Sequence, residues 1–373
     1  MNNDITYAGF EEMREFMRLA FTAAGVPEED AAICADVLIE SDKRGIDSHG
    51  VGRLKPIYLD RIKDGIQNAV TDFEIIRETP TTAVVDGHNG MGHVISVRAM
   101  RMSIDKARNC GLGMVAVRNS THYGIAGYYA LMAAKENMIC FTGTNARPSQ
   151  APTFGVENML GTNPLVIGFP SDEEFPFVLD CATSITQRGK IEHYARMDKE
   201  MPAGWVSDGD GNPVTDPAEA IKGLNNGTCA LAPLGGIGED FAGYKGYGYA
   251  TVVEVLSAAL QGGSFLRALS GTGSAGEKQP INLGHFFIAI DIGAFVCPDE
   301  FKKTTGDILR ELRASKKAAG QERIYTAGEK EYLNYLERSE TGIPLNPAVR
   351  ASLESVRDEL AVEFAFSWEQ PED

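Results

Sequence analysis

The chain has 373 residues, of which 43% are hydrophobic and 23% charged. These fractions are typical of folded globular proteins and exclude a disordered chain, a coiled coil and a membrane protein. The 35 basic and 52 acidic residues give a net charge of −17. Because that charge repels nucleic-acid phosphates and anionic lipid surfaces, we expect neither a nucleic-acid nor a membrane partner.

The cysteines and the start of the chain bear on where the protein works. Its six cysteines are scattered and contain no C-x-x-C pair, which favours a reduced protein over a disulfide framework or a zinc module. The first ten residues lack the pattern of a secretory signal. The most apolar stretch, 286–297, is interrupted by Asp291 and is too short to span a membrane. We therefore expect a cytoplasmic protein.

The first 75 residues are expected to be helical. Apolar residues recur at helical spacing over 10–21, and Gly25 then provides a stop. Pro27 starts a second helix with three acidic residues in its first turn. A third helix is expected over 54–62, with Tyr58 in its apolar stripe.

The middle of the chain alternates between strands and helices. Strands are expected at 82–85, 114–117, 138–142, 165–169, 177–179 and 286–290, and helices at 94–108, 126–134 and 247–260. On this alternation alone, the generic expectation is a doubly wound parallel sheet. From residue 298 onward the chain is charged and mainly helical, and we expect Phe301, Ile308, Leu309 and Leu312 to face inward.

Two glycine-containing motifs carry little functional weight. The only G-x-G-x-x-G run, 271–276, does not join a strand to a helix, as a dinucleotide-binding turn must, and is interpreted as a mobile surface loop. The acidic segment that starts at Asp208 resembles a calcium loop, but Pro213 stands where the sharp turn needs glycine. A β-turn is the better interpretation.

Two histidines lie in polar corners. His49 follows the second helix in RGIDSHGVGRL, and His122 lies between a strand and a helix in RNSTHYG. Either histidine alone could simply cap a helix. Two such corners with nearby guanidiniums indicate proton transfer on a small anionic substrate, because histidine moves protons and an arginine such as Arg53 binds carboxylate with two parallel hydrogen bonds.

A glycine-rich corner, GYKGYG at 243–248, precedes the helix expected at 247–260. Its free backbone amides and the Lys245 ammonium could meet a phosphate, although glycines before a helix are also common turn residues. The two interpretations have equal weight.

These blocks together resemble the malate/L-lactate dehydrogenase family that is distinct from the Rossmann-fold dehydrogenases. The similarity also runs through TNARPSQAPTFG, GTNP, LDCATS, PAGW, LAPLGG and GHFF, and covers nearly the whole chain. It implies an α/β (α+β) protein with a non-Rossmann cofactor domain built on a mainly antiparallel mixed sheet, and a helical domain formed by both chain ends. The expected segments are 1–75, 76–297 and 298–373. A homodimer or larger homo-oligomer is also implied.

The resemblance implies roles for individual residues. His122 matches the histidine usually treated as the proton donor and acceptor, and His49 matches a second active-site histidine to which some members give that role. Ser48 and Arg53 match substrate-binding positions. The positions that match cofactor contacts are Asn145, Asp180, Cys181, Ala182, Lys245, Gly284, His285 and Phe286.

The implied reaction is reversible hydride transfer between NAD or NADP and a 2-hydroxy or 2-oxo acid, without a metal. Malate/oxaloacetate is preferred, followed by L-lactate/pyruvate. Ureidoglycolate, sulfolactate or cyclic-imine chemistry within the family remains open, and a non-catalytic ligand-binding protein is a remote alternative. Because the net charge opposes an anionic substrate, we expect Arg44, Arg53, Arg147 and Lys245 to provide local positive potential.

Overall fold

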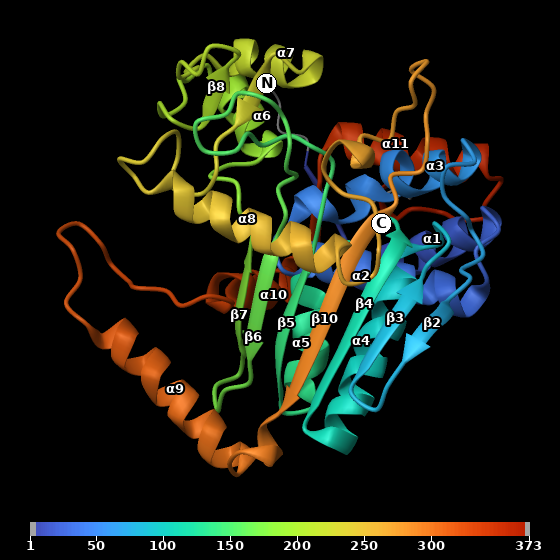
Figure 1. The fold of residues 1–373 in the computed structure, drawn as a ribbon. Helices are drawn as coiled ribbons and strands as arrows, with labels where there is room; N and C mark the ends of the chain where they lie inside the picture. Colours follow the sequence, from blue (N-terminus) through green and yellow to red (C-terminus); the bar gives the residue numbers. More distant parts are fainter. Residues whose placement is uncertain (1–4, 370–373) are drawn as a thin grey trace.

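The computed structural model describes residues 5–369 and is built around a sheet of seven strands (Figure 1). In spatial order these are β2 (Glu74–Glu78), β3 (Thr82–Asp86), β4 (Leu112–Ser120), β10 (Leu283–Asp291), β5 (Met138–Thr144), β6 (Leu165–Phe169) and β7 (Phe177–Cys181). Only β3 and β4 pair in parallel, and the other five pairs are antiparallel. The mainly antiparallel sheet is confirmed, whereas the doubly wound parallel sheet is wrong, because only the β3–β4 pair is joined by a crossover helix.

Helices cover both faces of this sheet. The crossover helix α4 (Gly92–Cys110) and α5 (Gly127–Lys135) lie on one face, and α8 (Gly243–Ala258) crosses the other (Figure 1). The contact of α8 with β10 is so close that a Cβ atom on Gly284 would lie 1.6 Å from the carbonyl oxygen of Ser257. Glycine is therefore required where helix and strand meet.

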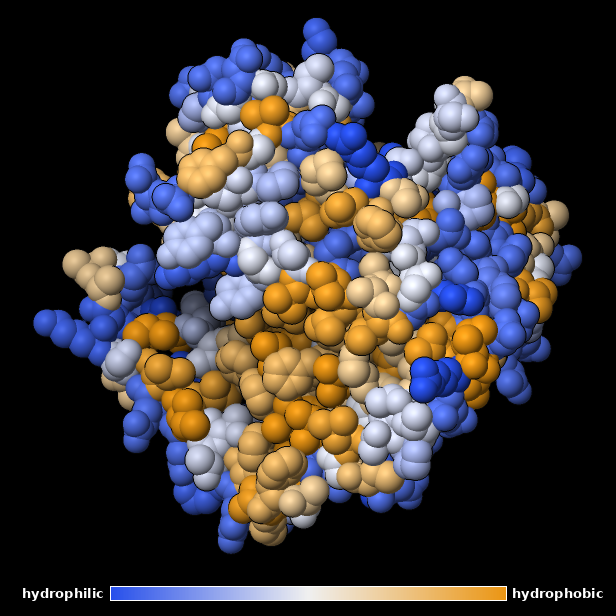
Figure 2. Space-filling view, viewed as in Figure 1, coloured by the Kyte–Doolittle hydropathy of each residue, from blue (hydrophilic) through white to orange (hydrophobic). Residues whose placement is uncertain are grey.

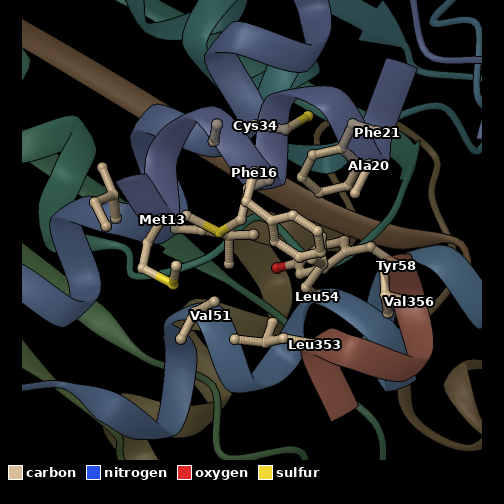
Figure 3. Packing of buried hydrophobic residues seen from close by; sticks show 14 of the residues in the cluster. Met13, Phe16, Ala20, Phe21, Cys34, Val51, Leu54, Tyr58, Leu353 and Val356 are labelled. Carbon is tan, nitrogen blue, oxygen red and sulfur yellow. The ribbon is translucent and has the colours of Figure 1, made fainter. Parts of the chain in front are cut away.

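A helical cluster combines both ends of the described chain. It contains α1 (Phe10–Ala23), α2 (Glu28–Lys43), the π-helix η3 (Leu54–Leu59), α3 (Asp60–Lys63) and α11 (Pro347–Glu359), and strand β1 (Thr6–Ala8) pairs with β11 (Ile343–Leu345). Its core joins Phe16, Phe21 and Tyr58 to Leu353 and Val356 (Figure 3). The predicted helical unit from both ends is thus confirmed.

Helix α9 (Pro298–Ala314) lies apart from that cluster (Figure 1). Leu309 is buried, but Ile308 and Leu312 are 55% and 54% exposed. The prediction that these two side chains face inward is therefore wrong, since α9 packs against the rest of the protein through a narrower face than its apolar residues form. The three-segment division at 75 and 297 stays a prediction, and residues 1–4 and 370–373 within it lie outside the described residues.

A small lobe, 188–231, was not foreseen. It contains α6 (Arg188–Arg196), β8 (Val206–Asp208), α7 (Pro217–Asn226) and β9 (Cys229–Leu231) around its own apolar core. At its edge the Gly211 amide donates to the Asp208 carbonyl at 3.1 Å, which confirms the predicted turn.

The remaining elements are short or peripheral. They are α10 (Glu329–Thr341) and the 3-10 helices η1 (Asp47–His49), η2 (Val51–Arg53), η4 (Leu266–Leu269), η5 (Ile292–Ala294) and η6 (Ser367–Glu369). The 271–276 glycine run forms a hairpin-like loop closed by a Thr272–Lys278 bridge. Between residues 5 and 369, no helix is both long and apolar enough to span a bilayer.

Candidate active site

The segment between α2 and η3 brings Ser48, His49 and Arg53 into one unit. The Ser48 hydroxyl lies 2.8 Å from His49 Nδ1, and Arg53 Nε donates to the Ser48 carbonyl oxygen. The guanidinium is thus anchored through Nε, which leaves its terminal nitrogens for a ligand. Such an arrangement suits bidentate binding of a carboxylate.

Buried polar contacts fix this segment in place. Asp42, at the end of α2, accepts a hydrogen bond from the Val51 amide at 2.8 Å. Arg338 of α10 donates to the Asp42 carbonyl and, at 3.0 Å, to the Asp47 carboxylate. The two Arg338 contacts could not be predicted from the sequence, because residues that are 296 and 291 positions apart share no local pattern.

His122 follows β4 and lies beside the first histidine. The two imidazole rings stack with centroids 5.7 Å apart and an interplanar angle of 22°. Its Nδ1 lies 2.6 Å from the Tyr58 hydroxyl and 3.3 Å from the Gly124 amide nitrogen. With Nδ1 engaged, Nε2 is the nitrogen available to a substrate.

Both histidines are neutral at physiological pH. Burial lowers the pKa of His49 to about 4, with a further contribution from the charge of Arg53. Burial also lowers the pKa of His122 well below its usual value, and the neighbouring His49 and His93 add to that effect. Neutral imidazole is the form that can accept a proton.

Sequence reasoning placed Tyr58 only in a helix stripe and missed its role. Tyr58 is fully buried, and its ring packs against that of His93 with the two ring centroids 4.5 Å apart. Burial keeps the pKa of Tyr58 well above 10 and lowers that of His93 to about 3, so both groups are uncharged. The π-helix that carries Tyr58 is a local irregularity often found at functional sites.

A cleft of 460 Å³ opens beside His49. Asp180, Cys181 and Ala182, which were predicted to contact a cofactor, line this cleft, and Asp180 accepts a hydrogen bond from the Gly127 amide at 2.7 Å. Burial raises the pKa of Asp180 to about 6.

Other groups on the cleft wall suit a polar, phosphate-bearing ligand. Among residues 5–369 the buried Tyr123 hydroxyl and Thr186 Oγ1 have no hydrogen-bond partner, and Lys190 adds an exposed ammonium. Unpaired buried polar atoms need a partner. Cleft size, unpaired polar groups and a cation together fit a nicotinamide dinucleotide.

The other predicted cofactor residues lie outside the cleft lining. Asn145 is buried, and its side chain binds the Gly284 amide and the Ser264 carbonyl. His285 and Phe286 are buried in β10, where the two His285 nitrogens bind the hydroxyls of Thr144 and Ser120 at 2.8 Å. The His285 ring stacks on the ring of Tyr123, a residue of the cleft lining, with the two ring centroids 4.4 Å apart. His285 thus supports the cleft wall without lining it. Direct contact of these residues with a cofactor stays a prediction.

The Lys245 corner packs against protein backbone. A Cβ atom on Gly246 would lie 2.2 Å from the Leu234 carbonyl oxygen, so this glycine serves a backbone contact. Lys245 itself is exposed on the first turn of α8. Arg44, expected to add positive potential, instead pairs with Glu40 at 2.7 Å.

Comparison with known proteins places the chain in a family. Residues 9–354 match the Malate/L-lactate dehydrogenase family. The chain belongs to this family. It is 43% identical over 353 residues to the malate dehydrogenase of Pyrococcus horikoshii, covering 95% of each chain. It is 40% identical to the L-sulfolactate dehydrogenase of Methanocaldococcus jannaschii, covering 91% of this chain and 92% of that one.

Solved structures of family members agree with the fold. A malate dehydrogenase from Entamoeba histolytica superposes with a TM-score of 0.93 at 44% identity, covering 97% of this chain and 100% of the other. The resemblance inferred from the sequence blocks is thereby confirmed. The protein is an oxidoreductase of the malate/L-lactate dehydrogenase family, and that family implies a nicotinamide cofactor and a small hydroxy or oxo acid.

Proposed function

We propose that the protein catalyses reversible hydride transfer between NAD or NADP and a small 2-hydroxy acid, with malate and oxaloacetate as the preferred pair. The observation that carries this proposal is the grouping of Arg53, His49, His122 and Tyr58 beside a cleft that fits the cofactor. The 43% and 44% identities to two Pyrococcus malate dehydrogenases support the choice of substrate.

Each of these side chains has a separate role in the proposed reaction. Arg53 holds the carboxylate next to the reacting carbon, and the neutral Nε2 of His122 takes the hydroxyl proton during oxidation. The Tyr58 hydroxyl accepts a hydrogen bond from the Nδ1–H of His122 and so stabilises the resulting imidazolium. In reduction the imidazolium returns the proton to the forming alkoxide. A nicotinamide bound in the cleft would supply or accept the hydride at C2 of the substrate.

His49 borders both the cleft and His122, with Ser48 holding its Nδ1. We assign it to orienting the substrate. His122→Ala is therefore expected to lower kcat by about 10²- to 10⁴-fold, whereas His49→Ala chiefly raises KM. Wild-type turnover in the His122 variant would refute the assignment.

The deciding assay follows nicotinamide absorbance with oxaloacetate, pyruvate, 2-oxoglutarate, sulfopyruvate and piperideine-carboxylate, each with NADH and NADPH. Oxaloacetate is expected to give the highest kcat/KM. A preference for sulfopyruvate would move the substrate assignment to sulfolactate, for which the 40% identical relative is named. The absence of turnover with every substrate would favour a ligand-binding protein.

A homodimer in the cytoplasm completes the proposal. Hydrophobic side chains gather over α8 and the strands beside it (Figure 2), and Tyr249, Val252 and Val255 of α8 are 49% to 54% exposed. An apolar face of this kind suits a second copy of the chain. Val252→Glu should produce monomers in sedimentation, whereas an unchanged dimer would place the interface elsewhere. All six cysteines are free, as a reducing compartment requires.

A further inference from the structure

Arg61 is an arginine without an anionic partner in a very acidic protein. It lies on α3, partly buried, and among residues 5–369 its guanidinium has no hydrogen bond or ion pair. The acidic residues at the two ends of this helix are paired elsewhere: Asp60, its first residue, with Lys55 at 3.3 Å, and Asp64, directly after it, with Lys278 at 2.6 Å. Carboxylates are thus nearby in sequence but do not neutralise Arg61.

The position of Arg61 is tied to the reacting groups. It follows Tyr58 by three residues along a continuous helical segment, so the two residues lie within one helical turn of each other. The Tyr58 hydroxyl contacts His122 at 2.6 Å. Burial is the main reason for the low pKa of His122, and the positive charges of Arg61 and Arg53 lower it further. Both guanidiniums are therefore within electrostatic reach of the proton-transferring imidazole.

A third guanidinium approaches from another part of the chain. Arg147, in the segment after β5, is exposed and unpaired within the described part of the chain, and its charge contributes to lowering the pKa of Arg61, after burial. Like charges gathered without counter-charges destabilise the folded protein. An anionic ligand between Arg61 and Arg147 would relieve that repulsion.

Arg53 and Arg61 are separate enough to bind two groups of one molecule. They are eight residues apart, which at helical rise corresponds to about 12 Å between their backbones. Because both side chains are long and flexible, their guanidiniums can approach each other to the length of a four-carbon diacid. Arg53 is anchored to Ser48 next to His49, which suits the carboxylate at the reacting carbon and leaves Arg61 for a second anion.

We propose that Arg61 and Arg147 form a second anion-binding subsite beside Arg53, which selects substrates with a further acidic group, carboxylate or sulfonate, besides the carboxylate at the reacting carbon. This inference rests on the proposed 2-hydroxy acid dehydrogenase activity. It makes Arg61 a specificity-determining residue.

The test compares substrates that differ in the second anion. Arg61→Gln, Arg61→Lys and the control Arg77→Gln, which removes an equal charge from an exposed position on β2, are assayed with oxaloacetate, sulfopyruvate and pyruvate. Arg61→Gln is expected to lower kcat/KM for whichever two-anion substrate the wild type prefers by about 10- to 150-fold, mainly through KM. Pyruvate should change less than about threefold, Arg61→Lys should recover part of the loss, and Arg77→Gln should match the wild type.

The outcomes separate the subsite from the activity. An equal loss on pyruvate and on the two-anion substrates, or no loss on any of them, overturns the subsite. A wild type inactive on every substrate refutes the proposed function instead. Calorimetric binding of L-malate in the presence of NAD or NADP then decides the subsite: weaker binding by Arg61→Gln supports it, and unchanged binding overturns it.

Discussion

Replacing Tyr58 with phenylalanine removes one oxygen atom and leaves the surrounding packing in place. The ring is fully buried between Phe21, at 6.0 Å, and His93, at 4.5 Å. The lost hydroxyl is 2.6 Å from Nδ1 of His122. Without it, the hydrogen-bonding group that remains beside Nδ1 in the described part of the chain is the Gly124 amide at 3.3 Å, which can donate but cannot accept a hydrogen bond.

The size of the effect follows from that geometry. When His122 carries the extra proton, its Nδ1–H needs an acceptor, and a hydrogen bond to a charged group contributes about 1.5–3 kcal/mol. At about 1.4 kcal/mol per factor of ten, kcat should fall by about 10- to 150-fold. The Gly124 amide also favours the tautomer with hydrogen on Nε2, which cannot accept the substrate proton there, so we expect a loss toward the upper end of this range.

The assay is steady-state kinetics in both directions, with thermal unfolding measured in parallel. KM should change little because Tyr58 does not hold the substrate carboxylate. A variant with kcat within twofold of wild type would refute the role of the hydroxyl. If kcat fell only together with a large loss of thermal stability, the effect would be structural.

Three further predictions concern pH and packing. In the oxidation direction, kcat/KM should stay level as pH falls through 6.5, because the lowered pKa keeps His122 deprotonated; a decline already at pH 7 would contradict this. Burial raises the pKa of Asp42 from 3.8 to about 8, so the folded protein holds a proton that the unfolded chain has lost, and wild-type stability should fall between pH 4 and 8. Asp42→Asn keeps an acceptor for the Val51 amide but lacks the titrating proton. The Tm of the variant minus that of the wild type should therefore increase from pH 5 to pH 8.5. A constant difference would argue against a buried acid. Gly246→Ala should lower the free energy of unfolding by about 1–3 kcal/mol through its clash with backbone, whereas Gly248→Ala, with open space beside it on the same helix, should be neutral or stabilising by up to about 1 kcal/mol in denaturation curves.

Local pattern located most strands and helices but could not order them. The strand expected at 165–169 coincides with β6, because a short apolar run between turns has few alternatives. Nothing local shows that β10 inserts between β4 and β5, since strand neighbours depend on contacts distant in sequence. Spacing likewise identified the apolar face of α9 without showing that Ile308 and Leu312 would remain exposed.

The site was only partly visible in the sequence. His49 and His122 could be found because imidazoles in polar corners are unusual, and the structure places them together. Tyr58 looked like any core residue, since its apolar ring does pack in the core and only its hydroxyl serves the site. Arg61 carries no signal at all, because the absence of an ion pair is a property of the folded molecule.

The pairing of β1 with β11 and the reach of Arg338 back to the segment before His49 have a consequence for biosynthesis. Translation proceeds from the N-terminus, so the histidine-bearing segment leaves the ribosome long before its supports exist. Leu353 and Val356, which close the core around Tyr58, emerge long after both histidines. A nascent polypeptide that still lacks α11 therefore contains both histidines without the complete core that holds Tyr58 beside His122.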